Sequence, residues 1–113
     1  AAASKGHFIF VKSEYKQLKI DLGEVLYFEG LKDYVKIWIS GQPKPVLTLM
    51  SLKTLEEELP REQFMRVHRS FIVSLDKIEA IDRGQILINK EYITVAEQYK
   101  ERFQAYISNR SIH

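Results

Sequence analysis

Apolar and polar residues alternate with a period of two along most of the first half of this chain. The alternation is clearest in two runs, formed by Leu18, Ile20 and Leu22 and by Val35, Ile37 and Ile39. A period of two puts every second side chain on the same face of an extended strand, so these runs predict strands with one buried face. Turn residues occur between the runs, at Gly23, 30–33 and 40–45. We therefore expect antiparallel strands at residues 7–12, 15–22, 25–29, 34–40 and 45–50.

The period changes at Ser51 to that of a helix. Ser51 is a suitable N-cap, Pro60 would end the helix, and the apolar positions between them are Leu52, Leu55 and Leu59. We expect a short helix near 51–59 whose leucines close the core. Three consecutive acids at 56–58 would lie on its outer side, where they would repel phosphates. This helix is therefore not expected to enter a DNA groove.

The second half returns to strand patterns and ends in another helix. Strands are expected at residues 64–67, 71–73, 77–81, 85–88 and 92–95, with chain reversals at Gly84 and at Asn89-Lys90. Thr94 and Glu97 have the spacing of a capping box, which satisfies backbone N–H groups at the start of a helix. A C-terminal helix near 95–107 would follow, with an apolar side formed by Tyr99, Phe103, Tyr106 and Ile107. The expected fold is mainly β, with short antiparallel sheets and two helices.

The polar block His68-Arg69-Ser70 interrupts an apolar, β-prone run that extends from Phe64 to Ser74. It contains no Gly, Pro, Asn or Asp that would mark an ordinary turn. Two cations and a hydroxyl between apolar anchors would suit contact with phosphate or with a base edge. The alternative is a strand with one solvated face, because Phe64, Arg66, His68 and Ser70 fall on one side at period two.

The composition limits the chain to one domain. At 113 residues and 45% hydrophobic content, it can bury a core but is too short for two ordinary domains. Residues 7–108 are expected to form this domain, after a linker remnant or cloning artefact at 1–6 and before a tail at 109–113. No segment has the length of a transmembrane helix or the form of a signal peptide. The absence of cysteine excludes disulfides and fits the reducing cytoplasm, where we expect the protein.

Few sequence features indicate catalysis or a cofactor. The three histidines, His7, His68 and His113, lack metal-ligand spacing, and there is no nucleophile elbow, dinucleotide fingerprint or P-loop. His68 would act as a base with Asp76 or Ser70 only if the fold brought them together. We therefore expect that the protein is not an enzyme and that it binds neither a cofactor nor a metal.

Two kinds of binding remain open. The formal net charge is only +2, so a nucleic-acid surface must come from the local arrangement of cations. The strands lack the signature of an RNA-recognition motif. A protein partner is also possible, and four aromatic residues could line its surface, although strand aromatics more often pack in the core: Tyr27, Phe28, Tyr34 and Trp38.

Four segments, in this order and spacing, resemble the LytTR-type DNA-binding domain: Glu24–Ile37, Leu49–Glu56, Phe64–Val73 and Ile93–Lys100. The resemblance covers about residues 8–107 and is sharpest in the Phe64–Val73 segment. It implies an array of short antiparallel sheets that serves as the output domain of a bacterial response regulator. Such a domain regulates transcription in a two-component phosphorelay by binding specific double-stranded DNA, entering major grooves with loops.

The resemblance also implies which residues contact DNA. They are Lys32 and Tyr34 in a first loop, His68, Arg69 and Ser70 in a second, and Glu97, Gln98 and Lys100 at the start of the last helix. Arg69 is expected to read a base edge, and its neighbours to orient the loop or bind phosphate. Many members of the family have Arg at the position of Glu97, which cannot donate to guanine. Glu97 is therefore expected mainly to complete the capping box.

The partners implied by the resemblance are double-stranded DNA and a second copy of the full-length protein. A phosphorylatable receiver domain would precede this domain and mediate a dimer on promoter direct repeats or paired half-sites. The alternative is a non-catalytic, β-rich protein–protein interaction module of the same fold without base-specific recognition. The small net charge and Glu97 favour this alternative, whereas steep salt dependence of binding would favour DNA.

Overall fold

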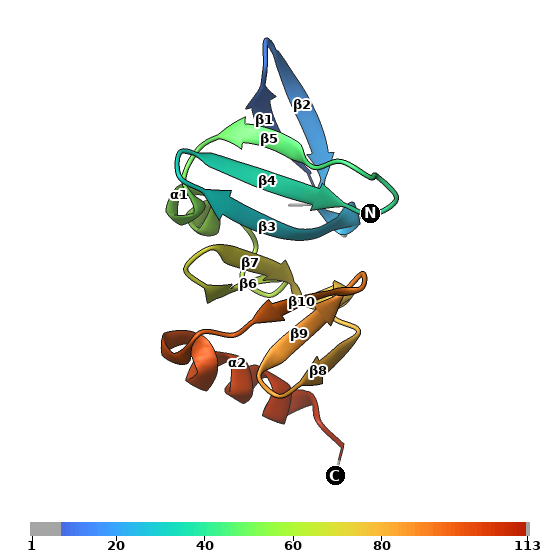
Figure 1. Ribbon diagram of the computed structural model, residues 1–113, viewed down its shortest axis with the longest axis vertical. Coiled ribbons are helices and arrows are strands. Elements are labelled where there is room, and N and C mark those ends of the chain that lie inside the picture. Colours follow the sequence, from blue (N-terminus) through green and yellow to red (C-terminus); the bar gives the residue numbers. More distant parts are fainter. Residues whose placement is uncertain (1–7, 113) are drawn as a thin grey trace.

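A five-stranded antiparallel sheet with strand order β5-β4-β3-β7-β6 forms the centre of the molecule (Figure 1). The hairpin β1-β2 lies at one end of the molecule, and a three-stranded sheet, β10-β9-β8, lies with helix α2 at the other. This computed structural model describes residues 8–112, so the segment expected at 1–6 and the strand start expected at His7 lie outside the described residues. The expected fold class, mainly β with short antiparallel sheets and two helices, is confirmed.

The strands of the central sheet are β3 (Val25–Leu31), β4 (Tyr34–Ile39), β5 (Val46–Leu49), β6 (Phe64–His68) and β7 (Phe71–Ser74). The remaining strands are β1 (Phe8–Ser13), β2 (Lys16–Asp21), β8 (Ala80–Asp82), β9 (Gln85–Ile88) and β10 (Glu91–Thr94). The helices are α1 (Leu52–Glu58) and α2 (Glu97–Arg110), with short 3-10 turns η2 (Leu22–Glu24) and η3 (Leu75–Lys77). Within this described part of the chain, no helix is long and apolar enough to cross a membrane.

Two expected strand boundaries were wrong. The strand expected at 77–81 begins only at Ala80, because Leu75–Lys77 forms a 3-10 turn that buries Leu75. The strand expected at 15–22 is shorter at both ends, because Tyr15 lies in a turn and Leu22 starts another 3-10 turn. Asp21 caps that second turn by accepting a hydrogen bond from the Gly23 amide at 2.9 Å. In both places, a local polar contact or a buried side chain favours a 3-10 turn where the alternation of apolar and polar residues predicts a strand.

The predicted capping box at the start of α2 was also wrong. Thr94 remains paired in β10, and the Val95 amide continues the extended chain by donating to the Gly84 carbonyl at 2.9 Å. The helix therefore begins later, with Ala96 as an N-cap that makes no side-chain cap bond. It also ends later than expected, at Arg110, because helical backbone continues through the start of the tail expected at 109–113.

The alternation of strand residues produces two hydrophobic clusters, one on each face of the central sheet. Phe28 packs in one cluster with Leu52 and Leu55 of α1, with Leu59 at the C-cap of that helix, and with residues of the β1-β2 hairpin. Its neighbour Tyr27 packs in the other, with β9, β10 and α2. Ser51 caps α1 by accepting from the Thr54 amide at 3.1 Å, so both the predicted cap and the predicted leucine side of this helix are confirmed. Phe103 is the buried centre of the predicted apolar side of α2.

Candidate nucleic-acid interface

The polar block is the tip of a hairpin. Strand β6 ends at His68 and β7 begins at Phe71, with Arg69 and Ser70 forming the turn between them. The alternative of a continuous strand with one solvated face is therefore wrong. Neither turn residue has a positive φ angle, which explains how a sequence without Gly or Asn reverses direction here. Arg69 is exposed at the tip, whereas His68 and Ser70 are half-buried.

Side chains from β6 hold the backbone of this turn. The Ser70 amide donates to Nδ1 of His68 at 3.0 Å. Arg66 donates from Nε to the His68 carbonyl at 3.3 Å and from Nη2 to the Arg69 carbonyl at 2.6 Å. As an acceptor, Nδ1 carries no proton, so neutral His68 has its N–H at Nε2. His68 thus orients the turn. Its Nδ1 accepts from the Ser70 backbone amide rather than from a catalytic partner.

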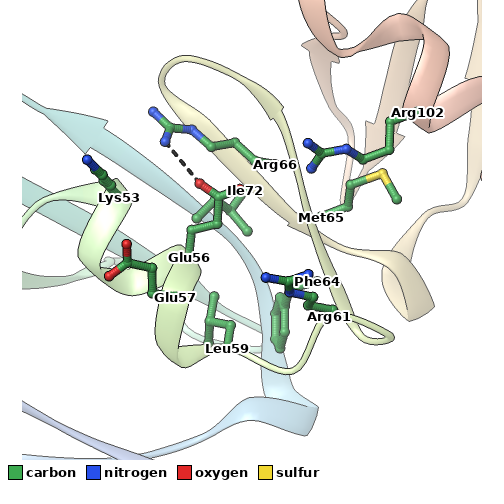
Figure 2. Close-up of a pocket in the computed structure, with 10 residues that line it drawn as sticks. All are labelled: Lys53, Glu56, Glu57, Leu59, Arg61, Phe64, Met65, Arg66, Ile72 and Arg102. Carbon is green, nitrogen blue, oxygen red and sulfur yellow. Dashed lines mark hydrogen bonds and ion pairs between the residues drawn. The ribbon is translucent and has the colours of Figure 1, made fainter.

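Arg66 also connects the turn to helix α1. Its Nη1 lies 3.2 Å from Oε1 of Glu56, and Figure 2 shows this ion pair beside a pocket of about 620 Å³. Sequence reasoning did not include Arg66 among the candidate site residues. Its place two residues before His68, on the same side of the strand, was the available signal. At a period of two, the position of Arg66 also fits an ordinary solvated strand residue, so it did not single out Arg66.

The first predicted loop lies beside this turn. The Gly30 amide donates to the Ser70 carbonyl at 2.8 Å, which joins the end of β3 to the β6–β7 tip. Lys32 occupies the β3–β4 turn with a left-handed φ of 52° and an exposed side chain. Tyr34 follows it at the start of β4 and is 51% exposed. The structure therefore brings Lys32 and Tyr34 close to the polar block.

The start of α2 approaches the same turn from the other side. The Ala96 amide donates to the Val67 carbonyl at 2.8 Å, directly before His68. Glu97 and Gln98 are exposed on the first helical turn, and Lys100 pairs with Glu97 at 3.2 Å. Because no side chain caps this helix, its first N–H groups are available to an anion.

All three predicted segments thus lie along one edge of the molecule, on the left in Figure 1. The tip of the β6–β7 turn is central, with the Lys32 turn hydrogen-bonded on one side and the start of α2 on the other. Exposed cations from different segments face solvent here: Lys32, Arg69 and Lys100. Such an edge can hold several phosphates of one nucleic-acid backbone and place a guanidinium at a base edge.

The aromatic surface considered for a protein partner is mostly packed. Tyr27 and Phe28 are buried, and Trp38 is half-buried with its indole N–H donating to Glu29 at 3.1 Å. Of the four aromatics, Tyr34 alone is exposed, and it belongs to the edge described above. Among residues 8–112, no cluster of three His, Cys, Asp or Glu side chains could hold a metal ion.

Comparison with known proteins gives a family and a similar solved structure. A family model described as LytTr DNA-binding domain matches residues 15–108. A solved structure from Bacillus cereus, the LytTr DNA-binding domain of a methyl-accepting/DNA response regulator, superposes with a TM-score of 0.72 at 25% sequence identity. That match covers 88% of this chain and 94% of the other.

Proposed function

This chain belongs to the LytTR family of DNA-binding domains, and we propose that it recognises specific double-stranded DNA with the edge formed by its three turns. The observation that supports this proposal most directly is the convergence of Lys32, Arg69 and the start of α2 on one edge. Shallow loops of this kind fit the major groove, whereas the acidic helix α1 would be repelled by phosphates.

Each predicted residue has a distinct role in this proposal. Arg69 reads a base edge, because its side chain is exposed at the tip of the β6–β7 turn and a guanidinium can bind guanine in bidentate fashion. Lys32, Ser70 and the first N–H groups of α2 bind phosphates. Tyr34 adds contact beside Lys32. Gln98 and Lys100 extend the phosphate contacts along the first turn of α2, while Glu97 limits the positive charge there.

We also propose that the domain is the output part of a transcriptional response regulator, because the similar Bacillus cereus structure is named as the DNA-binding domain of a methyl-accepting/DNA response regulator. A receiver domain would then control it by phosphorylation, and a dimer would occupy paired half-sites or direct repeats. Because promoter DNA lies in the bacterial cytoplasm, we propose that the domain acts there.

Selection of bound duplexes from a random DNA pool tests the proposal. The enriched sequence and a scrambled control are then titrated at two salt concentrations. We expect one enriched motif that binds more tightly than the control and weakens as salt rises, because phosphate contacts release counterions. Absence of DNA binding would favour the protein-interaction alternative.

Replacement of Arg69 by alanine tests the assigned base contact. We expect a loss of about 1 to 3 kcal/mol for the selected sequence and relaxed preference at one position. Lys44→Ala is the matched control, because it removes the same charge from the loop after β4, at the opposite end of that strand from the Lys32 turn. Unchanged affinity and preference in Arg69→Ala would remove Arg69 from the base-reading residues.

A further inference from the structure

We infer that Arg66 positions the β6–β7 turn for DNA recognition without contacting DNA, and that Glu56 on α1 fixes Arg66 in this role. The inference rests on the proposed function, since it assigns a supporting part to the same site. It concerns two residues outside the predicted contact set, one of them on the helix that phosphates should repel. The acidic helix would thus contribute to recognition indirectly.

The bonds of the Arg66 guanidinium support this assignment. Each of its three nitrogens has a partner in the protein: Nε binds the His68 carbonyl, Nη2 the Arg69 carbonyl and Nη1 the Glu56 carboxylate. Its side chain is 17% exposed, and Figure 2 shows it bonded to α1. Three of its five N–H donors are therefore bonded within the protein, whereas Arg69, one residue beyond His68, is exposed at the tip.

Only an arginine can make this set of contacts. The planar guanidinium carries five N–H donors in a fixed fork, so one side chain binds two successive turn carbonyls and a carboxylate together. A lysine ammonium at the same place would keep the charge but could not hold all three acceptors in this geometry. The distinction between arginine and lysine therefore separates positioning from simple charge attraction.

Glu56 differs from its two neighbours in the acidic run. It lies 3.2 Å from Arg66, whereas Glu57 and Glu58 have no cation within 4.0 Å among residues 8–112. Because the Glu56 side chain is 37% exposed, the ion pair itself adds little to stability. Its effect is to hold the guanidinium in the orientation that the turn requires.

Arg66→Lys and Arg66→Met are the first test, with the DNA selected for the wild-type domain as probe. We expect each substitution to weaken specific binding about ten- to a hundredfold. This loss corresponds to the free energy of the hydrogen bonds that the charged guanidinium makes. Binding to scrambled DNA and the dependence of affinity on salt should not change. Arg61→Lys is the control, because Arg61 lines the same pocket but makes no ion pair among the described residues.

A direct phosphate contact would give a different pattern. Arg66→Lys would then bind nearly as well as the wild type, while Arg66→Met would weaken all sequences alike and lower the salt dependence by about one counterion. That result would overturn the inference.

The matched pair Glu56→Gln and Glu57→Gln tests the role of α1. Both remove one negative charge from the same helix, so any general relief of phosphate repulsion is equal in the two. We expect Glu56→Gln to lose up to about fivefold in specific affinity relative to Glu57→Gln. Added to Arg66→Met, Glu56→Gln should cause no further loss, because the two residues act through one contact. Additive losses would contradict the link.

Amide hydrogen exchange provides a readout that needs no DNA. The Gly30 and Ser70 amides bond within and beside the turn, so they should exchange faster in Arg66→Lys at an unchanged melting temperature. Arg61→Lys should exchange like the wild type. If the wild-type domain binds no DNA, the proposed function fails and this measurement still decides the positioning role. Unchanged exchange in Arg66→Lys would overturn the inference.

Discussion

Three of the hairpin turns of this domain reverse the chain in two different ways. In the β8–β9 turn, Arg83 and Gly84 have φ angles of 53° and 76°, and in the β9–β10 turn, Asn89 and Lys90 have φ angles of 49° and 71°. Two central residues with positive φ form the type I′ arrangement, which matches the twist of the strands. The β6–β7 turn contains no such residue and is held by side chains instead.

This difference separates turns held by their own backbone conformation from a turn held by neighbouring side chains. A type I′ turn depends on its own backbone conformation and restricts which residues stand at its tip. The β6–β7 turn places its stabilising groups in β6 and α1, so Arg69 is left unconstrained at the tip. The orientation of this turn therefore involves residues ten positions apart in the sequence, Glu56 and Arg66.

The largest effect that we predict tests the packing role of the β9–β10 hairpin. Tyr27 packs against Ile88 and Ile93 of that hairpin, and burial, with smaller contributions from Glu91 and Glu29, raises its pKa to about 12. The unfolded chain releases this proton near pH 10, so ionisation favours the unfolded state above that pH. Stability from Tyr27 should be complete below pH 10 and fall by about 2 kcal/mol by pH 12.

Urea unfolding of the wild type and Tyr27→Phe between pH 9 and pH 12 measures this effect. All other ionisable groups are shared by the two proteins and contribute equally to both. The difference between the two free energies of unfolding should therefore decline only above pH 10. A constant difference would mean that the hairpin leaves the Tyr27 hydroxyl in water.

The second prediction concerns the support of the β6–β7 turn. A Cβ on Gly30 would lie 2.9 Å from Cδ1 and 3.0 Å from Cγ of Leu52, so Gly30→Ala must push α1 or its leucine away. We expect a loss of roughly 1 to 2 kcal/mol, because Leu52 can shift in part. DNA affinity should fall as well, since the Gly30 amide binds Ser70.

Chemical denaturation and DNA titration of Gly30→Ala measure the two effects. Gly41→Ala is a control for the loss of a glycine, since its left-handed φ of 81° brings strain but its Cβ would meet no neighbour. A Gly30→Ala protein with normal DNA affinity would show that the turn does not depend on its contact with β3.

The strands could be predicted well because their signal is local. Alternation decides which face of a strand is buried, and the observed clusters follow it at Tyr27 and Phe28. Prediction failed where tertiary contacts compete with the pattern. Before Ala80, Leu75–Lys77 forms a 3-10 turn that buries Leu75, so the chain joins the sheet later than its alternation suggests.

The candidate site could be predicted in part: the polar block His68-Arg69-Ser70 from its own residues, and the other two segments through the family resemblance. The resemblance named three separate segments, and the structure places them along one edge. It did not name Arg66, because an arginine on an alternating strand is usually solvated. Its role arises from contacts with two carbonyls and with a helix residue, none of which has a sequence signature. Which bases the edge reads depends on contacts with DNA and is likewise not encoded in any local pattern.

A third prediction tests whether backbone conformation, rather than side-chain contacts, determines the stability of the β9–β10 turn. Lys90 adopts a left-handed conformation that costs a residue with a side chain about 1 to 2 kcal/mol, and glycine adopts it without this strain. Lys90→Gly should therefore raise the free energy of unfolding by about 0.5 to 1 kcal/mol, after the entropy cost of glycine in the unfolded chain. Lys90→Ala removes the charge and keeps the strain, so it should not raise the melting temperature in thermal unfolding. Equal effects of the two substitutions would contradict the backbone explanation.

The smallest effect is expected at the start of α2, which has neither a side-chain cap nor a left-handed turn. Within residues 8–112, Glu97 pairs only with Lys100, and the two side chains are 91% and 53% exposed, so Glu97→Ala should change stability by less than about 0.5 kcal/mol. Removal of its charge should strengthen binding to all DNA sequences alike, because Lys100 is released toward phosphate. Glu101→Ala, on the same helix, is the control for a general charge effect.

Thermal unfolding and titration of selected and scrambled DNA distinguish three roles for Glu97. A loss near 1 kcal/mol would restore the capping role that the extended Thr94 argues against. An altered base preference at constant melting temperature would make Glu97 a reader of cytosine, the base whose amino group a carboxylate can accept. Uniformly tighter binding, which we expect, would leave base reading to the β6–β7 turn, where side chains rather than backbone conformation hold the tip.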